Sequence, residues 1–281
     1  MNGRSKGDGM KTIAITGAAS GIGAATAKQL ESEGHRVIGV DIQKADITAD
    51  LSIPDGRSQA VDQILEKSSG RLDGFVPCAG LSALPDRPAS LVVSLNYFGS
   101  IEMIAGLREA LAKSGEAAVV GICSNSTTST PGLPLELVEL LGTGDEEAAR
   151  ALADEIGAAD ENGWVMGYPA SKMALARWIR TQSVRDEWIG QGINLNAVAP
   201  GKTETAMLEE GRAHPIMGKH IDAFPMPVGR GGRAEEIASL ICFLLSPNAR
   251  FIVGSVFFID GGTDAQFRAN DFPSPMPTPP S

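Results

Sequence analysis

Three side chains of this sequence could together move a proton: the hydroxyl of Ser124, the phenol of Tyr168 and the ammonium of Lys172. Tyr168 and Lys172 are four positions apart, which on a helix places them on one face, one turn apart. A free tyrosine has a pKa of about 10, and a cation held beside it favours the phenolate and lowers that pKa. The pair is therefore a candidate general acid and base, although the same spacing also occurs on solvent-exposed helix faces.

A glycine-rich turn near the N-terminus could position a cofactor for these groups. Residues 11–16 are apolar and β-branched, as buried parallel strands are, and they lead through Gly17, Gly21 and Gly23 into a helical pattern over residues 22–33. In such a turn the glycines allow a sharp bend, close approach of a pyrophosphate and tight helix packing, and the helix N-terminus offers N–H groups to phosphates. A plain strand-to-helix turn is the alternative, but this context favours dinucleotide binding.

The next predicted strand, residues 36–41, ends in the carboxylate of Asp41, 18 positions after Gly23. An acid at this place accepts hydrogen bonds from the adenosine ribose of NAD and repels the extra phosphate of NADP. Lys44 is three positions further on, and no Arg or Lys lies inside the glycine turn. We therefore predict NAD as the cofactor, the alternative being an ordinary strand-end aspartate.

Composition limits the classes of protein that this chain can be. Of the 281 residues, 43% are hydrophobic and 21% charged, as in globular proteins, and the net charge is −10. An acidic surface argues against nucleic acid and anionic membranes as partners. The three cysteines have no CxxC spacing, which indicates buried, reduced thiols and a cytoplasmic protein. We expect no metal site, no membrane span and no signal peptide.

Strand and helix patterns alternate along the chain, which specifies a mostly parallel sheet with helices on both faces, the doubly wound Rossmann fold. We predict one domain over residues 11–265, between a disordered extension (residues 1–10) and a proline-rich tail (residues 266–281). The predicted strands are 11–16, 36–41, 73–78, 117–123, 192–198 and 254–259, with a short one near 46–49, and the predicted helices are 22–33, 56–68, 88–113, 168–188 and 233–246.

Taken in order, the motifs resemble those of the short-chain dehydrogenase/reductase family over residues 11–265. They comprise the glycine turn, Asp50, Ala79-Gly80, Asn96, Ser124, Tyr168-xxx-Lys172, Pro200-Gly201 and Asp260-Gly261-Gly262. A finer resemblance, to bacterial 3α-hydroxysteroid dehydrogenase/carbonyl reductases, rests on segments such as residues 21–26, 49–52, 78–81, 93–99 and 260–265. Coniferyl-alcohol-type dehydrogenases are similar in several of the same segments.

The resemblance implies roles for individual residues. Tyr168 would exchange the alcohol proton, Ser124 would stabilise the substrate oxygen, Lys172 would lower the tyrosine pKa and hold the nicotinamide ribose, and Asn96 would position a water. Ser126 is the rival to Ser124, and Thr203 could contact the carboxamide or cap a helix. The implied cofactor site is Gly17, Ser20, Gly21, Ile22, Gly23, Asp41, Ile42, Asp50, Leu51, Cys78, Ala79, Gly80, Tyr168, Lys172, Pro200, Gly201 and Thr203.

Two features depart from the family pattern. Cys78 stands where an asparagine is usual, and Pro77 before it should end or bulge the strand. Ser124 and Tyr168 are 44 positions apart, so residues 131–162 form an insertion, which we predict to contain two short helices. We expect this insertion to cover a helix face that many relatives use to build tetramers, and therefore to favour a homodimer.

Residues 203–230 are rich in methionine and other apolar residues, which is typical of an adaptable substrate lid. A plain amphipathic helix packed on the core is the alternative. The predicted substrate pocket comprises Ser126, Met166, Met207 and Met217. The predicted function is NAD-dependent interconversion of a secondary alcohol and a ketone on a small hydrophobic or cyclic substrate, steroid-like or aromatic. The alternatives are an aryl or phenylpropanoid alcohol dehydrogenase and, from another class, a non-catalytic dinucleotide sensor.

Overall fold

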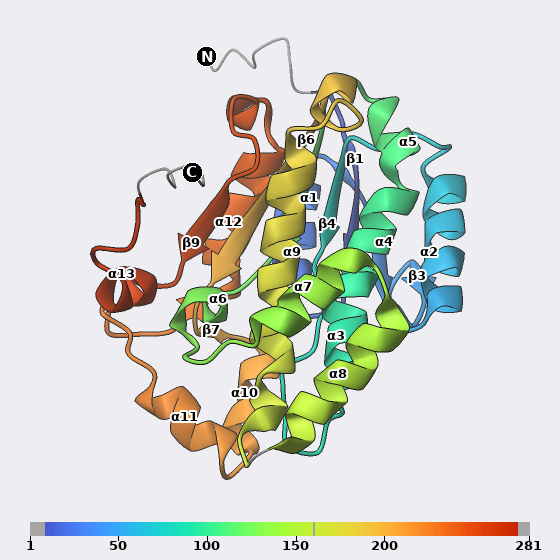
Figure 1. Cartoon of the computed structure of the whole chain (residues 1–281). Coiled ribbons are helices and arrows are strands. Elements are labelled where there is room, and N and C mark those ends of the chain that lie inside the picture. Colours follow the sequence, from blue (N-terminus) through green and yellow to red (C-terminus); the bar gives the residue numbers. More distant parts are fainter. Residues whose placement is uncertain (1–8, 160, 275–281) are drawn as a thin grey trace, which may run out of the picture.

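A seven-stranded, fully parallel sheet runs through the centre of the computed structural model, which describes residues 9–159 and 161–274 (Figure 1). The strand order is β3-β2-β1-β4-β5-β6-β9. The chain adds strands on one side of β1 first and then, from β4 on, on the other side, so the topological switch point lies between β1 and β4, where ligands of such sheets bind. This confirms the predicted doubly wound fold. The strands are β1 Thr12–Thr16, β2 Arg36–Asp41, β3 Ile47–Thr48, β4 Gly74–Pro77, β5 Ala117–Ile122, β6 Ile193–Pro200 and β9 Val256–Ile259.

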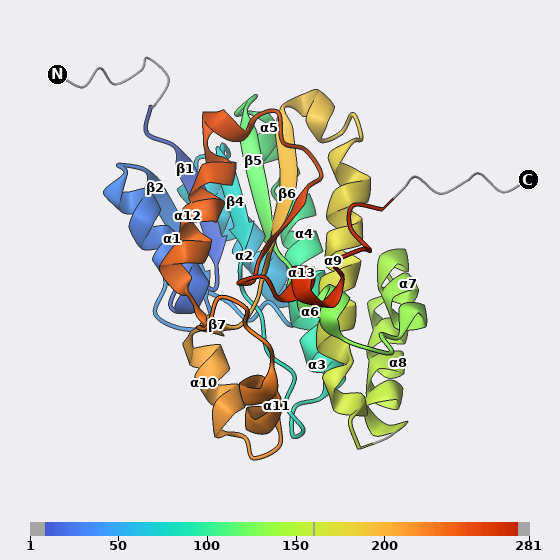
Figure 2. The ribbon, with the colours of Figure 1, turned by 90° about the vertical axis from the view of Figure 1, so that its left-hand side faces the viewer.

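Helices cover both faces of the sheet (Figure 2). One face carries α1 (Gly21–Ser32) and α12 (Ala234–Leu245), and the other carries α2 (Pro54–Lys67), α4 (Gly99–Gly106) and α9 (Gly167–Ser183). Side chains of one strand alternate between the two faces: Ala14 packs in one cluster, and its neighbours Ile13 and Ile15 pack in the other. Both faces of the sheet are buried, as a parallel sheet requires.

The observed strands lie close to the predicted ones, with differences at their ends. β4 ends at Pro77, as the missing backbone donor of proline predicts. β6 continues to Pro200, two residues beyond the predicted end, and β9 starts at Val256 rather than at residue 254. α9 ends at Ser183, five residues before the predicted end, because a tight loop and a left-handed residue at Gly192 lead directly into β6.

The predicted continuous helix 88–113 is wrong. The segment instead consists of α3 (Ala89–Val93), a π-helical turn (Ser94–Phe98), α4 and, after a break at Leu107, α5 (Arg108–Ala112). The Ser100 hydroxyl donates to the carbonyl of Asn96 in this turn, at 2.9 Å. A π turn inserts one residue into the helical spacing, so hydrophobic periodicity alone does not reveal it.

The stretch Ala89–Gly106 is long and apolar enough, by length and composition, to cross a membrane, contrary to the expectation from the sequence. It is 67% buried inside the protein, where it packs against α9 and α8 (Glu146–Ala159). Its apolar character is therefore that of a core helix.

The insertion forms α7 (Leu135–Thr143) and α8, which confirms the two predicted helices and adds an outer layer over α9 and α3 (Figures 1 and 2). Leu137 and Leu141 of α7 are fully buried. In α8, the Asp154 carboxylate accepts a hydrogen bond from the Ser90 backbone N–H at 2.8 Å and so caps α3. The insertion is thus an integral part of the core.

A buried arginine also ties the insertion to the rest of the fold. Arg57 of α2 is 2% exposed, and its guanidinium pairs with Glu102 of α4 at 2.6 Å and with Glu146 of α8 at 2.5 Å. It also donates a long bond, 3.4 Å, to the carbonyl of Leu51. Three helices are therefore joined by one cation.

The predicted lid, residues 203–230, contains α10 (Ala206–Ala213) and α11 (Met217–Ala223), which lie beyond the C-terminal ends of the strands in both views (Figures 1 and 2). Two short strands that the sequence did not reveal, β7 (Thr203–Glu204) and β8 (Gly232–Arg233), pair with each other and close the base of this segment. The predicted N-terminal extension and the end of the proline-rich tail (1–8 and 275–281) lie outside the described residues.

Candidate functional site

The glycine turn between β1 and α1 has the geometry expected of a phosphate-binding loop. Gly17 has φ +66°, and a Cβ there would lie 2.9 Å from the Ala79 backbone nitrogen. A Cβ at Gly23 would lie 2.1 Å from the Gly17 carbonyl oxygen. At Gly21, which has φ +54° and lines the cavity described below, such a Cβ would be in ordinary contact with the methyl of Thr205, at 3.5 Å. Ser20 makes no side-chain cap, so its hydroxyl does not occupy the N–H groups at the start of α1, where an anionic ligand would bind.

Asp41 lies at the end of β2 and lines a cavity that the glycine turn also lines. Its Oδ2 accepts a bond from the Ala19 N–H at 3.0 Å, and its Oδ1 accepts one from the Ile42 N–H at 2.7 Å. Asp50 lines the cavity beside it, and its Oδ1 accepts bonds from the Ser52 N–H (2.9 Å) and hydroxyl (2.6 Å). Asp50 therefore shapes the turn at residues 50–52 and also lies at the cavity wall, where the resemblance placed it in the cofactor site.

The segment after β4 closes against the glycine turn. The Ala79 N–H donates to the Thr16 hydroxyl at 3.0 Å. This bond joins the end of β1 to the segment after β4, next to Cys78, the residue that stands where the resemblance would place an asparagine. Burial raises the pKa of the Cys78 thiol to about 12, and that of Cys123 likewise, so both stay protonated. Cys78, Ala79 and Gly80 all line the cavity.

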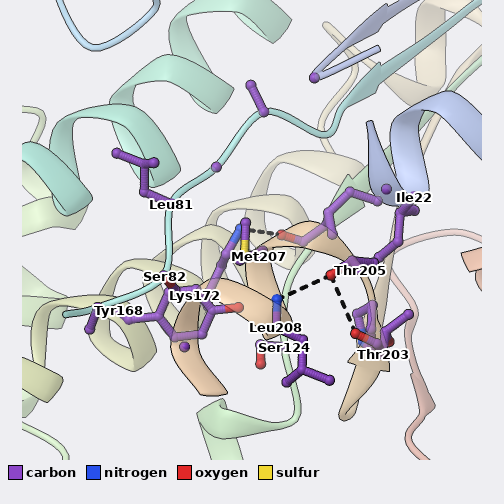
Figure 3. Close-up of a pocket in the computed structure, with 18 of the residues that line it drawn as sticks. Ile22, Leu81, Ser82, Ser124, Tyr168, Lys172, Thr203, Thr205, Met207 and Leu208 are labelled. Atoms are coloured by element: carbon purple, nitrogen blue, oxygen red, sulfur yellow. Dashed lines mark hydrogen bonds between the residues drawn. The ribbon is translucent and has the colours of Figure 1, made fainter. Parts of the chain in front are cut away.

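Ser124 and Tyr168 meet in the same cavity (Figure 3). Burial raises the pKa of the Tyr168 phenol, and a hydrogen bond with the Ser124 side chain opposes that rise. The Ser124 Oγ also accepts a bond from the Ser126 backbone N–H at 3.2 Å. A hydroxyl oxygen that accepts an N–H in this way can direct its own proton elsewhere, toward Tyr168 or a ligand oxygen.

Lys172 lies one turn further along α9 and is 5% exposed. Its Nζ donates to the Ile122 carbonyl oxygen at 2.8 Å and lies 5.9 Å from the centre of the Tyr168 ring. Burial lowers the pKa of Lys172. The sequence argument predicted that this ammonium lowers the tyrosine pKa; in the structure the net shift of the Tyr168 pKa is upward, because burial of the phenol dominates.

Asn96 is fully buried in the π-helical turn, and its side chain pairs with one backbone unit. Its Oδ1 accepts from the Leu81 N–H at 2.8 Å, and its Nδ2 donates to the Leu81 carbonyl at 2.9 Å. A Cβ on Gly80 would lie 3.0 Å from the same Oδ1. The amide thus satisfies the backbone groups of Leu81 and shapes the loop after β4.

The segment after β6 places Pro200, Gly201 and Thr203 at the cavity wall. The Thr203 hydroxyl donates to the Gly201 carbonyl at 3.0 Å, and Thr203 lies in β7, so the alternative of a helix cap at Thr203 is wrong. The cap of α10 is Thr205, whose Oγ1 accepts from the Leu208 N–H at 3.4 Å (Figure 3). Sequence reasoning missed Thr205 as a cavity residue, although a threonine three positions before Leu208 is a helix-start signal.

The glycine turn, Asp41, Asp50, Ser124, Tyr168, Lys172 and Thr203 line one cavity of about 670 Å³, and the buried Asn96 lies behind its wall. Its acidic lining residues, Asp41 and Asp50, lie near the glycine turn, while the walls formed by the lid and the loop after β4 are mostly apolar. Ser126, Met207 and Met217 line it as predicted, but Met166 does not; the neighbouring Val165 takes that place. The apolar lining residues on the Tyr168 side are Leu81, Ala83, Leu91, Leu95, Val165, Met207, Leu208, Met217, Ile221 and Phe224.

Two family models match the chain: "short chain dehydrogenase" over residues 11–133 and "Enoyl-(Acyl carrier protein) reductase" over residues 148–264. The 3-alpha-hydroxysteroid dehydrogenase/carbonyl reductase of Comamonas testosteroni is 40% identical over 94% of this chain and 100% of its own. The coniferyl-alcohol dehydrogenase of Pseudomonas sp. strain HR199 is 30% identical over 90% of this chain and 96% of its own.

A solved structure is similar over the same span. The 3-alpha-hydroxysteroid dehydrogenase from Pseudomonas sp. B-0831, complexed with NADH, is 43% identical with a TM-score of 0.86, and the match covers 93% of this chain and 100% of that one. The chain belongs to the short-chain dehydrogenase/reductase family, as the motifs indicated. Its similarity to 3α-hydroxysteroid dehydrogenases agrees with the finer resemblance.

Proposed function

We propose that this protein is an NAD-dependent oxidoreductase that interconverts a secondary alcohol and a ketone on a hydrophobic or cyclic substrate. One observation carries the proposal: Ser124, Tyr168 and Lys172 line the same cavity as the glycine turn, and a hydrogen bond with Ser124 opposes the rise that burial causes in the pKa of the Tyr168 phenol. The relatives named for oxidation or reduction of hydroxysteroids and carbonyl compounds support it.

The residues at the C-terminal ends of β1, β2 and β4 fit an NAD molecule. The N-terminus of α1, which the Ser20 side chain does not cap, and Gly21 at the cavity wall would receive the pyrophosphate. Asp41 and Ile42 would receive the adenosine ribose, and the carboxylate of Asp41 would disfavour the additional phosphate of NADP. The solved relative in complex with NADH supports the same choice of cofactor.

When bound, NAD supplies the site that accepts or donates a hydride. In reduction the Tyr168 phenol donates its proton to the substrate oxygen, and in oxidation the phenolate, which the Lys172 ammonium would favour, accepts the alcohol proton. Ser124 donates its hydroxyl proton to the substrate oxygen and stabilises the negative charge that grows there. The Lys172 ammonium has three N–H donors, so it would bind the nicotinamide ribose either in addition to the Ile122 carbonyl or in its place.

Asn96 has a supporting place in this scheme. The family resemblance assigns it a water next to the lysine, and in this chain its amide is bonded to Leu81 on the wall of the cavity. We propose that Asn96 keeps the loop after β4 in the shape that leaves room for Lys172 and that water. This loop passes the lysine at Gly80, where an added Cβ would lie 3.6 Å from the Lys172 Nζ.

The apolar walls of the cavity favour a hydrophobic substrate, and two types of substrate fit that description. A hydroxysteroid or a cyclic ketone is favoured by the relatives at 40% and 43% identity. An aryl or phenylpropanoid alcohol is the second candidate, because the coniferyl-alcohol dehydrogenase is similar over nearly its whole length. A non-catalytic dinucleotide sensor would have no need of Ser124, Tyr168 and Lys172 together.

Absorbance of the nicotinamide band tests this proposal. Purified protein is assayed with NAD(H) and with NADP(H) against 3-ketosteroids, cyclic ketones, aryl ketones and cinnamyl-type alcohols. Turnover with NAD(H) on a steroid or cyclic substrate supports the proposal, and turnover on cinnamyl-type alcohols alone supports the second candidate. Binding of NADH without turnover of any of them would favour the sensor.

We also propose a homodimer. The helices α7 and α8 cover α9 and α3 with buried side chains such as Leu137 and Ala153, so the helix face that many relatives pair is occupied by the chain itself. The mass of the particle in solution, measured by light scattering, should equal two chains. A tetramer assembled through α4 and α9 would contradict the proposed role of the insertion.

A further inference from the structure

Two walls of the substrate side of the cavity come from segments far apart in the chain. Leu81 and Ser82, from the loop between β4 and α3, form one wall, and Met207 and Leu208 of the lid helix α10 form part of another. Figure 3 shows Leu81 and Ser82 together with the lid residues around the same space as Tyr168. What holds these walls in place decides the shape of the space in which a substrate meets Tyr168.

One arginine connects the two walls. Arg87, at the end of the loop after β4, donates from its Nη1 to the Ser82 carbonyl at 2.7 Å and to the Ser82 hydroxyl at 3.2 Å. Its Nη2 donates to a carboxylate oxygen of Glu210, on α10, at 2.7 Å. The side chain of Arg87 is 15% exposed and that of Glu210 is 47% exposed, so the pair lies at the rim of the cavity, partly shielded from water.

The other attachments of the lid lie at its base or on its far side. At the end of the segment, the Thr263 hydroxyl donates to the Pro225 carbonyl at 2.9 Å, and the Val228 N–H donates to the Gly261 carbonyl at 3.1 Å. Beyond α10, the ring of His214 lies 6.5 Å from that of Trp164, in the short turn between the insertion and α9. None of these contacts reaches the loop after β4, which Arg87 grips through Ser82.

We propose that Arg87 and Glu210 are positioning residues that clasp the lid helix α10 to the loop after β4 and thereby hold the substrate side of the cavity closed around its ligand. Neither residue lines the cavity, so neither contacts the reacting atoms. The inference rests on the proposed function, because it concerns the site in which the alcohol or ketone would bind. It assigns to the pair an effect on substrate affinity and none on the chemical step.

The size of the effect follows from the exposure of the pair. Partly exposed ion pairs contribute little, and their loss changes an equilibrium by about two- to fivefold. Since a closed lid favours the bound substrate, KM for the substrate should rise by about that factor in Glu210→Gln, while kcat does not fall. High salt screens such a pair, so the KM of the parent protein should also rise with salt, and that of Glu210→Gln should rise less.

A neighbouring ion pair on the same helix provides a matched control. Arg212 pairs with Glu209 at 2.6 Å entirely within α10, so Glu209→Gln removes the same charge without loosening the lid from the loop. The set of variants is Glu210→Gln, Glu209→Gln, Arg87→Lys and the reversal Arg87→Glu with Glu210→Arg. Steady-state kcat and KM are measured at low and high salt with a substrate found by the screen above, and NADH affinity is measured by fluorescence.

The clasp predicts a raised KM in Glu210→Gln that rises less with salt than the parent value, and unchanged kcat and KM in Glu209→Gln. In Arg87→Lys and in the reversal, KM should lie between the values of the parent protein and Glu210→Gln. NADH affinity should stay within about twofold of the parent value in every variant. Equal KM values for Glu210→Gln and Glu209→Gln, or a loss confined to kcat, would overturn the inference. Absence of turnover in the parent protein itself would instead refute the proposed function, so the two failures are distinct.

Discussion

Replacement of Ser124 by alanine tests whether Ser124 or Ser126 of the same loop stabilises the substrate oxygen. Ser124 Oγ interacts with Tyr168 and accepts the Ser126 N–H at 3.2 Å. Ser126 also lines the cavity, but its own Oγ is buried with no hydrogen-bond partner. Both serines are hydroxyls in the right region, and only their contacts separate them. Ser124→Ala and Ser126→Ala therefore form a pair of equal substitutions two positions apart.

The expected magnitude follows from what each hydroxyl contacts. Loss of one donor to a developing oxyanion costs about 2.7–4 kcal/mol, or about 10²–10³ in rate. The variant Ser124→Ala also removes the hydrogen bond that opposes the raised Tyr168 pKa, which makes the phenolate harder to form. In Ser126→Ala an unpartnered hydroxyl is removed and the backbone N–H to Ser124 remains, so the rate should change by less than about threefold.

The assay follows kcat/KM for oxidation and for reduction at one pH, with NADH affinity measured separately. Because the overall equilibrium is fixed, kcat/KM should fall by the same factor in both directions if cofactor affinity is unchanged. A larger loss in Ser126→Ala than in Ser124→Ala would refute the assignment and make Ser126 the group at the substrate oxygen.

Three further outcomes are expected. Asp41→Ala should weaken NADH binding by about tenfold, since a charge-assisted hydrogen bond contributes about 1.5–3 kcal/mol, and should narrow the preference over NADPH in parallel titrations. Ultraviolet difference titration against Tyr168→Phe, without cofactor, should show Tyr168 ionising above the ordinary value of about 10, since burial raises its pKa; ionisation below that value would contradict the burial argument. Arg57→Met should destabilise the fold by about 3 kcal/mol in urea unfolding, because Glu146 stays largely buried without its cation, and Arg57→Met with Glu146→Gln should recover part of that loss.

Much of the cofactor side of the cavity could be predicted from the sequence because its constraints are local. Gly17 must adopt a positive φ and lie against Ala79, and Gly23 must lie against the Gly17 carbonyl, so glycine is required at both. Asp41 follows from the end of a β-branched strand. The second helix of the insertion followed from the acidic residues at its start and from its alanine content.

Features that depend on several distant segments could not be predicted. The π-helical turn at Ser94–Phe98 places Asn96 against Leu81, and no spacing rule signals the extra residue. The pKa of Tyr168 depends on how deeply the phenol is buried, which pairwise spacing with Lys172 does not reveal. The contact between Arg87 and Glu210 joins positions 123 residues apart and appears only once the lid is folded over the loop.

The central claim is that the Tyr168 phenol exchanges the proton while the rest of the chain holds cofactor and substrate. The most direct test compares Tyr168→Phe with the parent protein, with turnover followed by nicotinamide absorbance and NADH affinity by fluorescence. Loss of about 10²–10⁴ in kcat with an unchanged NADH dissociation constant is the predicted result. Retained turnover would contradict the claim, because phenylalanine fills the same space and carries no proton to exchange.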